Sequence, residues 1–239
     1  MRLQLEAERL SAREFLGVPA RDFARGGREQ LAILLNAGLN PDSKVVDLGC
    51  GVLRAGYWLI HFLDADGYCG IEPHAGRLAI GTERVLEPAL IAAKRPRFDS
   101  NATFDTSVFG ERFDFFLAYS IWTHASRRQV GQTLDAFVRD ATPDAVFLTT
   151  YLPASWRHPA YTADAWFGTS HESDVPGCIH HPTRWIRAEC ARRGLFVRPL
   201  GRDRTHGQSW LEISRRPPRP YARLRAARDV IWRALAPLR

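Results

Sequence analysis

The chain has 239 residues, of which 45% are hydrophobic and 25% charged, as in an ordinary soluble globular protein with room for one large α/β domain. No stretch approaches 18 uninterrupted apolar residues, and the charged N-terminal stretch lacks the apolar region of a secretory signal, so we expect neither a membrane span nor a leader. The net charge is +7, but Arg215–Arg239 alone carries eight arginines and one acid. The rest of the chain is therefore neutral, which disfavours a nucleic-acid partner.

Helical and strand patterns alternate along the chain. Two helices come first, and the second ends at Gly38. A buried strand, a helix and a second strand follow, and helices and strands then continue to alternate. The predicted helices are 3–16, 23–39, 53–63, 74–90, a helix from about Ser126, and 182–194; the predicted strands are 44–48, 68–71, a short one near Phe98, 113–118, 144–152, 195–201 and 208–214.

This order of elements predicts an α/β fold. Strands that read as near-continuous apolar runs and alternate with helices indicate a mainly parallel sheet covered on both faces. The last two strands are joined by a short polar turn, which predicts an antiparallel hairpin at the end. We expect an N-terminal helical cap at 1–40, the main domain at 41–214, and a basic tail helix at 215–239.

Four cysteines, Cys50, Cys69, Cys178 and Cys190, are scattered without paired spacing. This distribution predicts reduced thiols in a cytoplasmic protein, with neither a disulfide framework nor a zinc site.

The stretch "KVVDLGCGVLRAG" places a glycine turn directly after the first strand. In such a sheet, ligands bind at the carboxyl ends of the strands. A nicotinamide or flavin site requires G-x-G-x-x-G, but Arg54 stands at the third glycine position. Asp47, two residues before Gly49, would repel a pyrophosphate and attract a cation by on the order of a few kcal/mol. The turn therefore favours a cationic ligand over a phosphate.

A second acid, Glu72 in "GIEP", lies 25 residues beyond Asp47 at the end of the second strand. An acid at this position accepts hydrogen bonds from ribose hydroxyls. S-adenosylmethionine, with its α-ammonium and sulfonium, fits a ligand that has a ribose, a cation and no phosphate. The alternatives are a plain tight turn, with Glu72 capping the next helix, Cys50 as a turn residue and Arg54 as a surface or packing residue.

Three motifs, "VVDLGCG", "GIEP" and "FDFFLAYSIWTH", resemble those of class I S-adenosylmethionine-dependent methyltransferases. The resemblance spans about Gly26 to Ser214 and implies a Rossmann-like, mainly parallel seven-stranded sheet with helices on both faces and a reversed terminal strand. It also implies S-adenosylmethionine as cofactor and S-adenosylhomocysteine as product. The cofactor-binding residues implied by position are Gly26, Gly27, Asp47, Gly49, Cys50, Gly51, Glu72, Pro73, Asp105, Tyr119 and Ser120.

The segment after the fourth strand bears on the methyl acceptor. Enzymes that methylate base amines or glutamine carry an Asn/Asp-Pro-Pro-Tyr type motif there, and this chain has "YSIWTH" instead. We therefore expect O-methylation of a small-molecule or glycan hydroxyl, with His124 as general base, because its ordinary pKa of about 6.5 suits a hydroxyl proton. A capping or packing role for His124 is the alternative.

The long loop before the helix at 182–194 is rich in Trp, Tyr and His and predicts an acceptor pocket or lid, in which Trp156 or Trp166 would stack on a sugar. The predicted substrate residues are Trp122, Tyr151, Trp166, His181 and His206. A metal site from His158, His171, Glu172, His180 and His181 is the alternative; their spacing matches no standard ligand pattern, so we expect none.

The basic tail places Leu224, Ala227, Ile231, Leu235 and Leu238 on one helical face. Such a helix either lies on the inner, anionic surface of a membrane or packs on the body, a partner or a second copy in a homodimer. Two alternatives to the hydroxyl enzyme remain open: a small-molecule N-methyltransferase, and a non-catalytic S-adenosylmethionine-binding protein attached through this tail. The neutral body disfavours an RNA methyltransferase.

Overall fold

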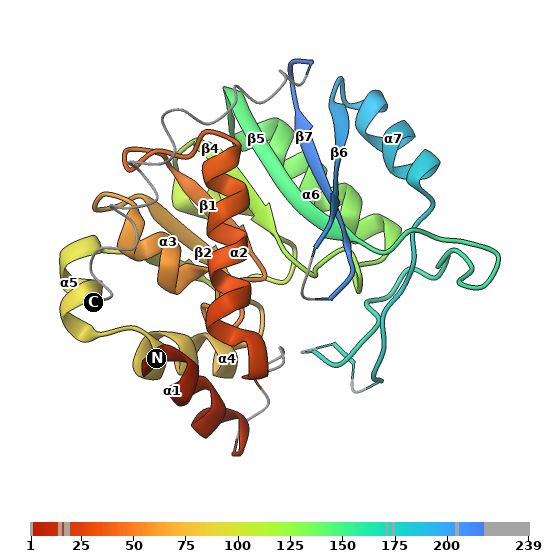
Figure 1. Cartoon of the computed structure of the whole chain (residues 1–239). Coiled ribbons are helices and arrows are strands. Elements are labelled where there is room, and N and C mark those ends of the chain that lie inside the picture. Colours follow the sequence, from red (N-terminus) through yellow and green to blue (C-terminus); the bar gives the residue numbers. More distant parts are fainter. Residues whose placement is uncertain are drawn as a thin grey trace.

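The structure is a computed structural model and describes residues 2–13, 16, 20–170, 172–173, 175–203 and 206–217. These residues form one seven-stranded sheet in the order β3-β2-β1-β4-β5-β7-β6 (Figure 1). The strands are β1 (Val45–Leu48), β2 (Tyr68–Ile71), β3 (Arg97–Asp99), β4 (Phe113–Ala118), β5 (Ala141–Tyr151), β6 (Phe196–Arg202) and β7 (Ser209–Ser214).

The helices are α1 (Arg2–Ser11), α2 (Phe23–Asn36), α3 (Gly56–Phe62), α4 (Ala75–Ile80), α5 (Pro88–Lys94), α6 (Arg127–Asp140) and α7 (Thr183–Arg192), with the short turns η1 (Ala20–Asp22), η2 (Gly81–Val85, a π-helix) and η3 (Thr106–Phe109). Strands β1 to β5 pair in parallel, whereas β7 is antiparallel to both β5 and β6. The predicted sheet and its reversed strand are therefore confirmed.

Alternate side chains of the strands build a core on each face of the sheet. Val45 and Leu117 pack with apolar residues of α1, α2 and α3. Val46 and Phe116 point to the opposite face and pack with α6 and α7, where Phe137 meets Phe116 edge to face at 5.1 Å between ring centroids. Because both faces are covered, the strands are apolar throughout.

Several predicted helices differ from the structure, and the one expected over 3–16 ends at Ser11. The helix expected from Leu53 begins at Gly56, because Leu53 has a left-handed backbone (φ 62°) that a helix cannot contain. The helix expected over 74–90 breaks into α4, η2 and α5. The break lies at Glu87, whose backbone is extended (ψ 136°), as expected for a residue before a proline such as Pro88.

Helix α6 begins where the sequence predicts. The Ser126 side chain accepts a hydrogen bond from the Gln129 N–H, and the Gln129 side chain accepts one from the Ser126 N–H. This reciprocal cap fixes the segment that connects β4 to α6, and so places the residues that follow β4.

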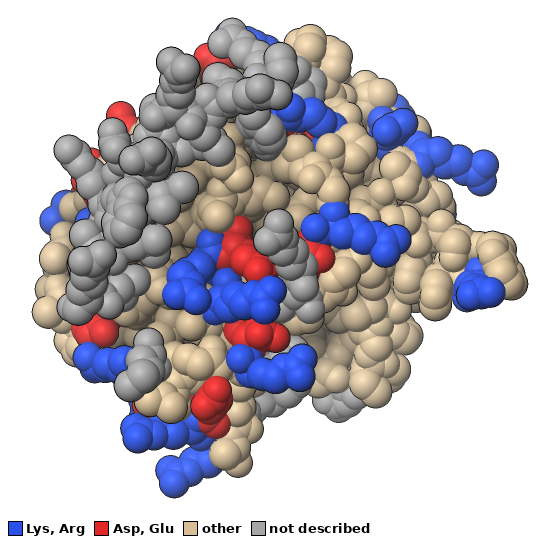
Figure 2. All heavy atoms as spheres, in the orientation of Figure 1, with Lys and Arg blue, Asp and Glu red and all other residues tan. Residues whose placement is uncertain are grey.

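Strand order reverses between β1 and β4, so the carboxyl ends of these strands form the usual crevice of such a sheet. In Figure 2, basic and acidic side chains lie beside one another around the middle of the face shown. Among the described helices, none combines the length and apolar composition needed to cross a bilayer. The predicted tail helix lies outside the described residues from 218 onward.

Candidate cofactor and acceptor site

The turn after β1 contains two glycines with left-handed backbones, Gly49 (φ 71°) and Gly51 (φ 57°). A Cβ on Gly49 would lie 2.1 Å from Cδ1 of Ile121, so packing alone requires glycine there. A Cβ on Gly51 would project into open space, with only Oε2 of Glu72 at 4.0 Å. The turn therefore leaves open space beside Glu72, which we call the hollow, where the Gly51 backbone can approach a ligand.

Glu72 follows β2 and is only 5% exposed. Its Oε2 accepts a hydrogen bond from the Gly51 N–H and its Oε1 accepts one from the His74 N–H, both at 2.9 Å. An ionised carboxylate offers about four lone-pair sites. Glu72 is thus held in place by backbone donors while acceptor capacity remains for ribose hydroxyls.

Asp47 lies on β1, the strand that leads into this turn, and is 3% exposed. Its Oδ2 accepts a hydrogen bond from the Tyr68 hydroxyl at 2.9 Å. Burial raises the pKa of Asp47 to about 7, and the Tyr68 hydrogen bond only partly offsets this. A buried carboxyl with a raised pKa favours binding of a cation, which would restore its charged form.

Arg54 is buried rather than on the surface, contrary to the surface alternative raised from the sequence. It is 5% exposed, and its Nη1 has no hydrogen-bond partner. Its Cζ lies 5.0 Å from the centroid of the Tyr119 ring, and burial lowers its pKa. The turn therefore holds a buried cation as well as a buried carboxyl.

The segment after β4 adjoins the glycine turn. Ser120 has a left-handed backbone (φ 61°), a strained conformation for a residue other than glycine. Its N–H donates to Oγ1 of Thr150 at 2.8 Å, and its Oγ accepts from Nε2 of Gln208 at 2.8 Å. Hydrogen bonds from β5 and from the β6–β7 turn thus hold Ser120 at the edge of the crevice.

Comparisons with known proteins give structural matches only. No protein family profile matches the sequence, and no curated protein matches it. The fold is similar to magnesium protoporphyrin IX methyltransferase from Synechocystis with bound S-adenosylhomocysteine (TM-score 0.59, 16% identity, 89% of this chain and 94% of that chain). The chain has the fold of class I S-adenosylmethionine-dependent methyltransferases.

Two further solved structures share this methyltransferase fold. The glycopeptide N-methyltransferase MtfA with S-adenosylmethionine matches at a TM-score of 0.58 and 15% identity, over 79% of this chain and 93% of that chain. The sugar N-methyltransferase KedS8 from Streptoalloteichus matches at 0.59 and 16% identity, over 82% and 89%. At such identities the likeness concerns the fold.

The remaining predicted cofactor residues lie at different depths around the crevice. A Cβ on Gly27 would clash with the Arg54 carbonyl at 2.2 Å and with Trp58, so this glycine permits α2 to pack closely on α3. Cys50 points into the core. The Asp105 carboxylate caps η3 through the Ser107 N–H and pairs with Arg139 of α6 at 2.6 Å. Its main chain is paired as well: the N–H donates to Oδ1 of Asn101 at 2.8 Å, and the carbonyl accepts from Nδ2 of Asn101 at 3.2 Å.

His124 lies at the same edge, next to the long loop, which we call the arm (residues 152–182). Its Nδ1 lies 2.9 Å from the Phe167 carbonyl, and its ring stacks on Trp166 with centroids 5.7 Å apart. A carbonyl only accepts, so Nδ1 carries the hydrogen and Nε2 of the neutral ring has a lone pair. Burial lowers the pKa of His124, which favours this neutral form.

The arm is fastened to the methyltransferase fold near His124 and extends away from the sheet (Figure 1). The Ile179 N–H donates to the Thr123 carbonyl at 2.8 Å, and the Phe167 N–H donates to the His124 carbonyl at 2.9 Å. Trp156, further along the arm, is 86% exposed. Of the two tryptophans predicted to stack on an acceptor, Trp166 therefore lies beside the crevice.

Three predicted substrate residues are core residues. Trp122 is fully buried, and its indole N–H donates to Thr133 Oγ1 at 3.1 Å. Tyr151 is 4% exposed. His181 is fully buried, with Nε2 3.0 Å from the Ala125 carbonyl. Their burial argues against direct contact with an acceptor. Sequence patterns alone do not separate an aromatic residue that lines a pocket from one that fills the core.

His206, by contrast, reaches the crevice from the β6–β7 turn. Its Nδ1 lies 2.9 Å from the Tyr119 hydroxyl, which also donates to Oδ2 of Asp203 at 3.1 Å. Desolvation lowers the pKa of His206. Sequence reasoning missed Asp203, and its spacing within a polar turn gives no signal of this contact.

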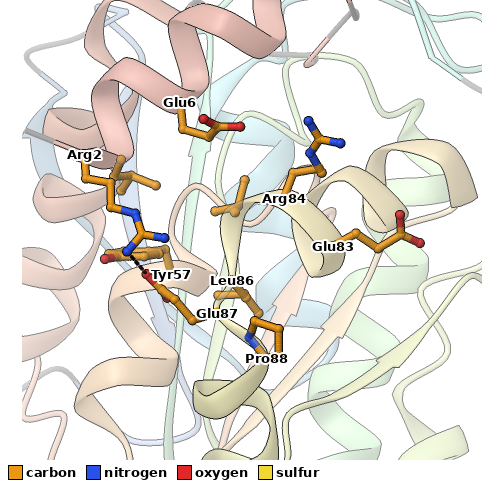
Figure 3. Close-up of a pocket in the computed structure, with 10 residues that line it drawn as sticks. Arg2, Glu6, Tyr57, Glu83, Arg84, Leu86, Glu87 and Pro88 are labelled. Atoms are coloured by element: carbon orange, nitrogen blue, oxygen red, sulfur yellow. Dashed lines mark ion pairs between the residues drawn. The ribbon is translucent and has the colours of Figure 1, made fainter.

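Two other features lie apart from the crevice. His158 and His180 stack with ring centroids 4.7 Å apart, but no group of three metal-ligating side chains occurs among the described residues, and His171 is outside them. A cavity of about 280 Å³ lies under α1, where Arg2 pairs with Glu87 at 3.7 Å (Figure 3). This cavity contains none of the predicted site residues.

Proposed function

We propose that this protein is an S-adenosylmethionine-dependent methyltransferase. One observation carries the proposal: a buried carboxyl (Asp47), a second carboxylate held by backbone donors (Glu72), and an open hollow at Gly51 meet where the strand order reverses. This combination suits a ribose and a cation. The methyltransferase fold supports the same conclusion.

Each of these residues has a distinct part in holding the cofactor. Glu72 accepts hydrogen bonds from the ribose hydroxyls, and Asp47 supplies the negative charge near the cationic end. The Gly49–Gly51 backbone and the edge formed by Tyr119 and Ser120 border the methyl-donor side. Pro73 and the main chain at Asp105 border the adenine side. When bound, the cofactor supplies a methyl group on a sulfonium, ready for in-line displacement.

The acceptor we propose is a hydroxyl of a small molecule or glycan. His124 acts as general base through Nε2, since Nδ1 is occupied by the Phe167 carbonyl. Its lowered pKa keeps the imidazole neutral at pH 7, the form that takes a proton. Trp166, stacked on His124, provides a flat apolar surface on which a sugar ring can rest.

A second candidate is N-methylation of an amino sugar or another small amine. The Asp203 carboxylate, 3.1 Å from the Tyr119 hydroxyl, places a negative charge at the crevice where an ammonium group could bind. Two proteins of the same fold are named as glycopeptide and sugar N-methyltransferases, which is compatible with this candidate.

The test is methyl transfer from methyl-labelled S-adenosylmethionine to a panel of sugars, polyhydroxylated small molecules and the matching amino sugars. We expect transfer to a hydroxyl compound. His124→Gln should lower turnover about 10²-fold or more and leave cofactor affinity unchanged. His61→Gln is the matched control, because His61 also contacts a backbone carbonyl, that of Tyr57 at 2.7 Å, but lies on α3.

Other outcomes point to the alternatives. Transfer to amino sugars alone would replace the hydroxyl proposal with the amine, and an unchanged rate in His124→Gln would remove the base role from His124. Cofactor binding with no transfer to any acceptor would favour a non-catalytic binding protein. In that case the search would move to the predicted tail, to membrane or self-association through it, and to a cytoplasmic partner.

A further inference from the structure

Arg54 is a buried cation whose hydrogen-bond donors are not all paired within the chain. It is 5% exposed, and its Nη1 has no hydrogen-bond partner. Burial of an unpaired charge is costly, and an orphaned N–H of a charged group adds to that cost. Such a side chain is expected where a ligand of opposite charge completes its hydrogen bonds.

The surroundings of Arg54 keep the guanidinium in place. A Cβ at Gly26 would lie 3.2 Å from Nη1, so this glycine at the start of α2 gives the guanidinium its space. The Tyr119 ring lies on another side, 5.0 Å from Cζ. Asp47 and Asp203 attract the Arg54 charge. However, none of the ion pairs within 4 Å in the described part of the chain joins Arg54 to either carboxylate.

We propose that Arg54 binds the carboxylate of the cofactor's methionine end, and that Arg54 and Asp47 together select a ligand with a zwitterionic α-amino-acid group. This inference rests on the proposed function. A guanidinium matches a carboxylate through two parallel N–H donors, and the free Nη1 supplies one of them. Asp47 offers the negative charge that the α-ammonium requires. The two buried opposite charges at one turn thus match the two charges of one ligand group.

The test is calorimetric titration with two ligands that share adenosine and a thioether but differ at this end. S-adenosylhomocysteine has the amino-acid group, and 5′-methylthioadenosine lacks it. We expect Arg54→Met to weaken S-adenosylhomocysteine binding about 10²-fold and to leave methylthioadenosine binding within about twofold. Arg54→Lys, which keeps the charge but not the two-donor geometry, should give an intermediate loss.

Arg28→Met is the matched control. Arg28 also packs over an aromatic ring, with Cζ 5.6 Å from the Trp58 ring centroid, but its side chain is exposed. This variant should bind both ligands as the wild type does. The S-adenosylhomocysteine methyl ester provides a test without mutation: the wild type should bind it about as weakly as Arg54→Met binds the acid, and Arg54→Met should bind ester and acid alike.

Loss of affinity for both ligands by the same factor in Arg54→Met would assign Arg54 a purely structural role and overturn the inference. Equal binding of the acid and its ester by the wild type would overturn it as well, even if the Met variant does not fold. Failure of the wild type to bind S-adenosylhomocysteine or S-adenosylmethionine at all would instead refute the proposed function.

Discussion

The hydroxyl of Tyr68 on β2 donates a hydrogen bond to the buried Oδ2 of Asp47 on the neighbouring strand β1, at 2.9 Å. Tyr68 pairs with Val45 in the ladder, so its side chain lies on the same face of the sheet as that of Asp47. Burial raises the pKa of Tyr68, which keeps its hydroxyl a donor. The hydrogen bond orients the Asp47 carboxyl but brings no positive charge to it. A bound cation can therefore still shift its ionisation.

Asp47→Asn should stabilise the protein without cofactor at alkaline pH. The folded pKa of Asp47 is about 7, against about 3.9 for an unfolded Asp. The folded state therefore binds a proton more tightly, and wild-type stability falls as pH rises from about 4 to 7. Asn has no proton to lose and still accepts from Tyr68. Urea unfolding should show little difference at pH 4 and a gain on the order of a few kcal/mol at pH 8.

A difference between wild type and Asp47→Asn that stays constant from pH 4 to 8 would contradict this account. Asp114→Asn is a control for the general effect of removing an acid near the sheet. Asp114 accepts hydrogen bonds from the Lys44 N–H at 2.9 Å and from Thr142 Oγ1 at 3.0 Å. Its variant should not stabilise the protein at pH 8.

Cofactor affinity should fall as pH drops below about 7. A cation bound near Asp47 lowers the pKa of its carboxyl, so binding requires the proton to leave. Between the free and bound pKa values the loss approaches tenfold per pH unit. Calorimetry with S-adenosylmethionine from pH 5.5 to 8 measures this, and Asp47→Asn should bind more weakly with no such slope. A steep slope retained in that variant would assign the effect to another group.

Gly49→Ala should chiefly lower stability, whereas Gly51→Ala should chiefly lower cofactor affinity. Both glycines have φ values that cost a residue with a Cβ roughly 1–2 kcal/mol. Gly49→Ala adds a clash with Ile121 and should lower stability further. Gly51→Ala places its methyl in the hollow beside Glu72, so it should lose cofactor affinity at least about tenfold while remaining folded. Urea unfolding and calorimetry on both variants check this, and normal binding by Gly51→Ala would exclude the hollow as the cofactor site.

Thr150→Val should lower the stability of the protein by removing hydrogen bonds at the edge of the crevice. Thr150 is fully buried, accepts from the Ser120 N–H at 2.8 Å and donates to Gln208 at 2.5 Å. Valine has the same shape but leaves both groups unpaired, at a cost of about 2 kcal/mol or more. Thr149→Val is the control, since Thr149 makes one bond, to the Ala118 carbonyl at 3.0 Å. Urea unfolding should show the larger loss for Thr150, and equal losses would contradict this assignment.

The fold was predictable because its determinants are local. Apolar runs bounded by glycine and polar turns predict the strands, and the Ser126 cap predicts the start of α6. The proposed cofactor side rests on similarly local features, since Asp47, Gly49 and Glu72 lie within or just after two consecutive strands. Leu53 was missed as a helix breaker because its left-handed backbone depends on the turn as a whole.

The proposed acceptor side depends on contacts between distant segments. Asp203 meets Tyr119 across 84 residues, and the sequence holds no periodic signal for such a contact. Trp122 and His181 resemble pocket residues by type, yet tertiary packing buries both. For Arg54 the sequence left a surface or a packing role open, because arginine is mostly exposed; the structure buries it, with space at Gly26.

The central claim is best tested by calorimetric titration of the purified protein with S-adenosylmethionine and, in parallel, with NADH. The account predicts micromolar binding of S-adenosylmethionine, no binding of NADH, and loss of S-adenosylmethionine binding in Glu72→Ala, whose ribose acceptors are gone. Circular dichroism of Glu72→Ala would establish that the variant is folded. Absence of S-adenosylmethionine binding to the folded wild type, or full affinity in folded Glu72→Ala, would contradict it.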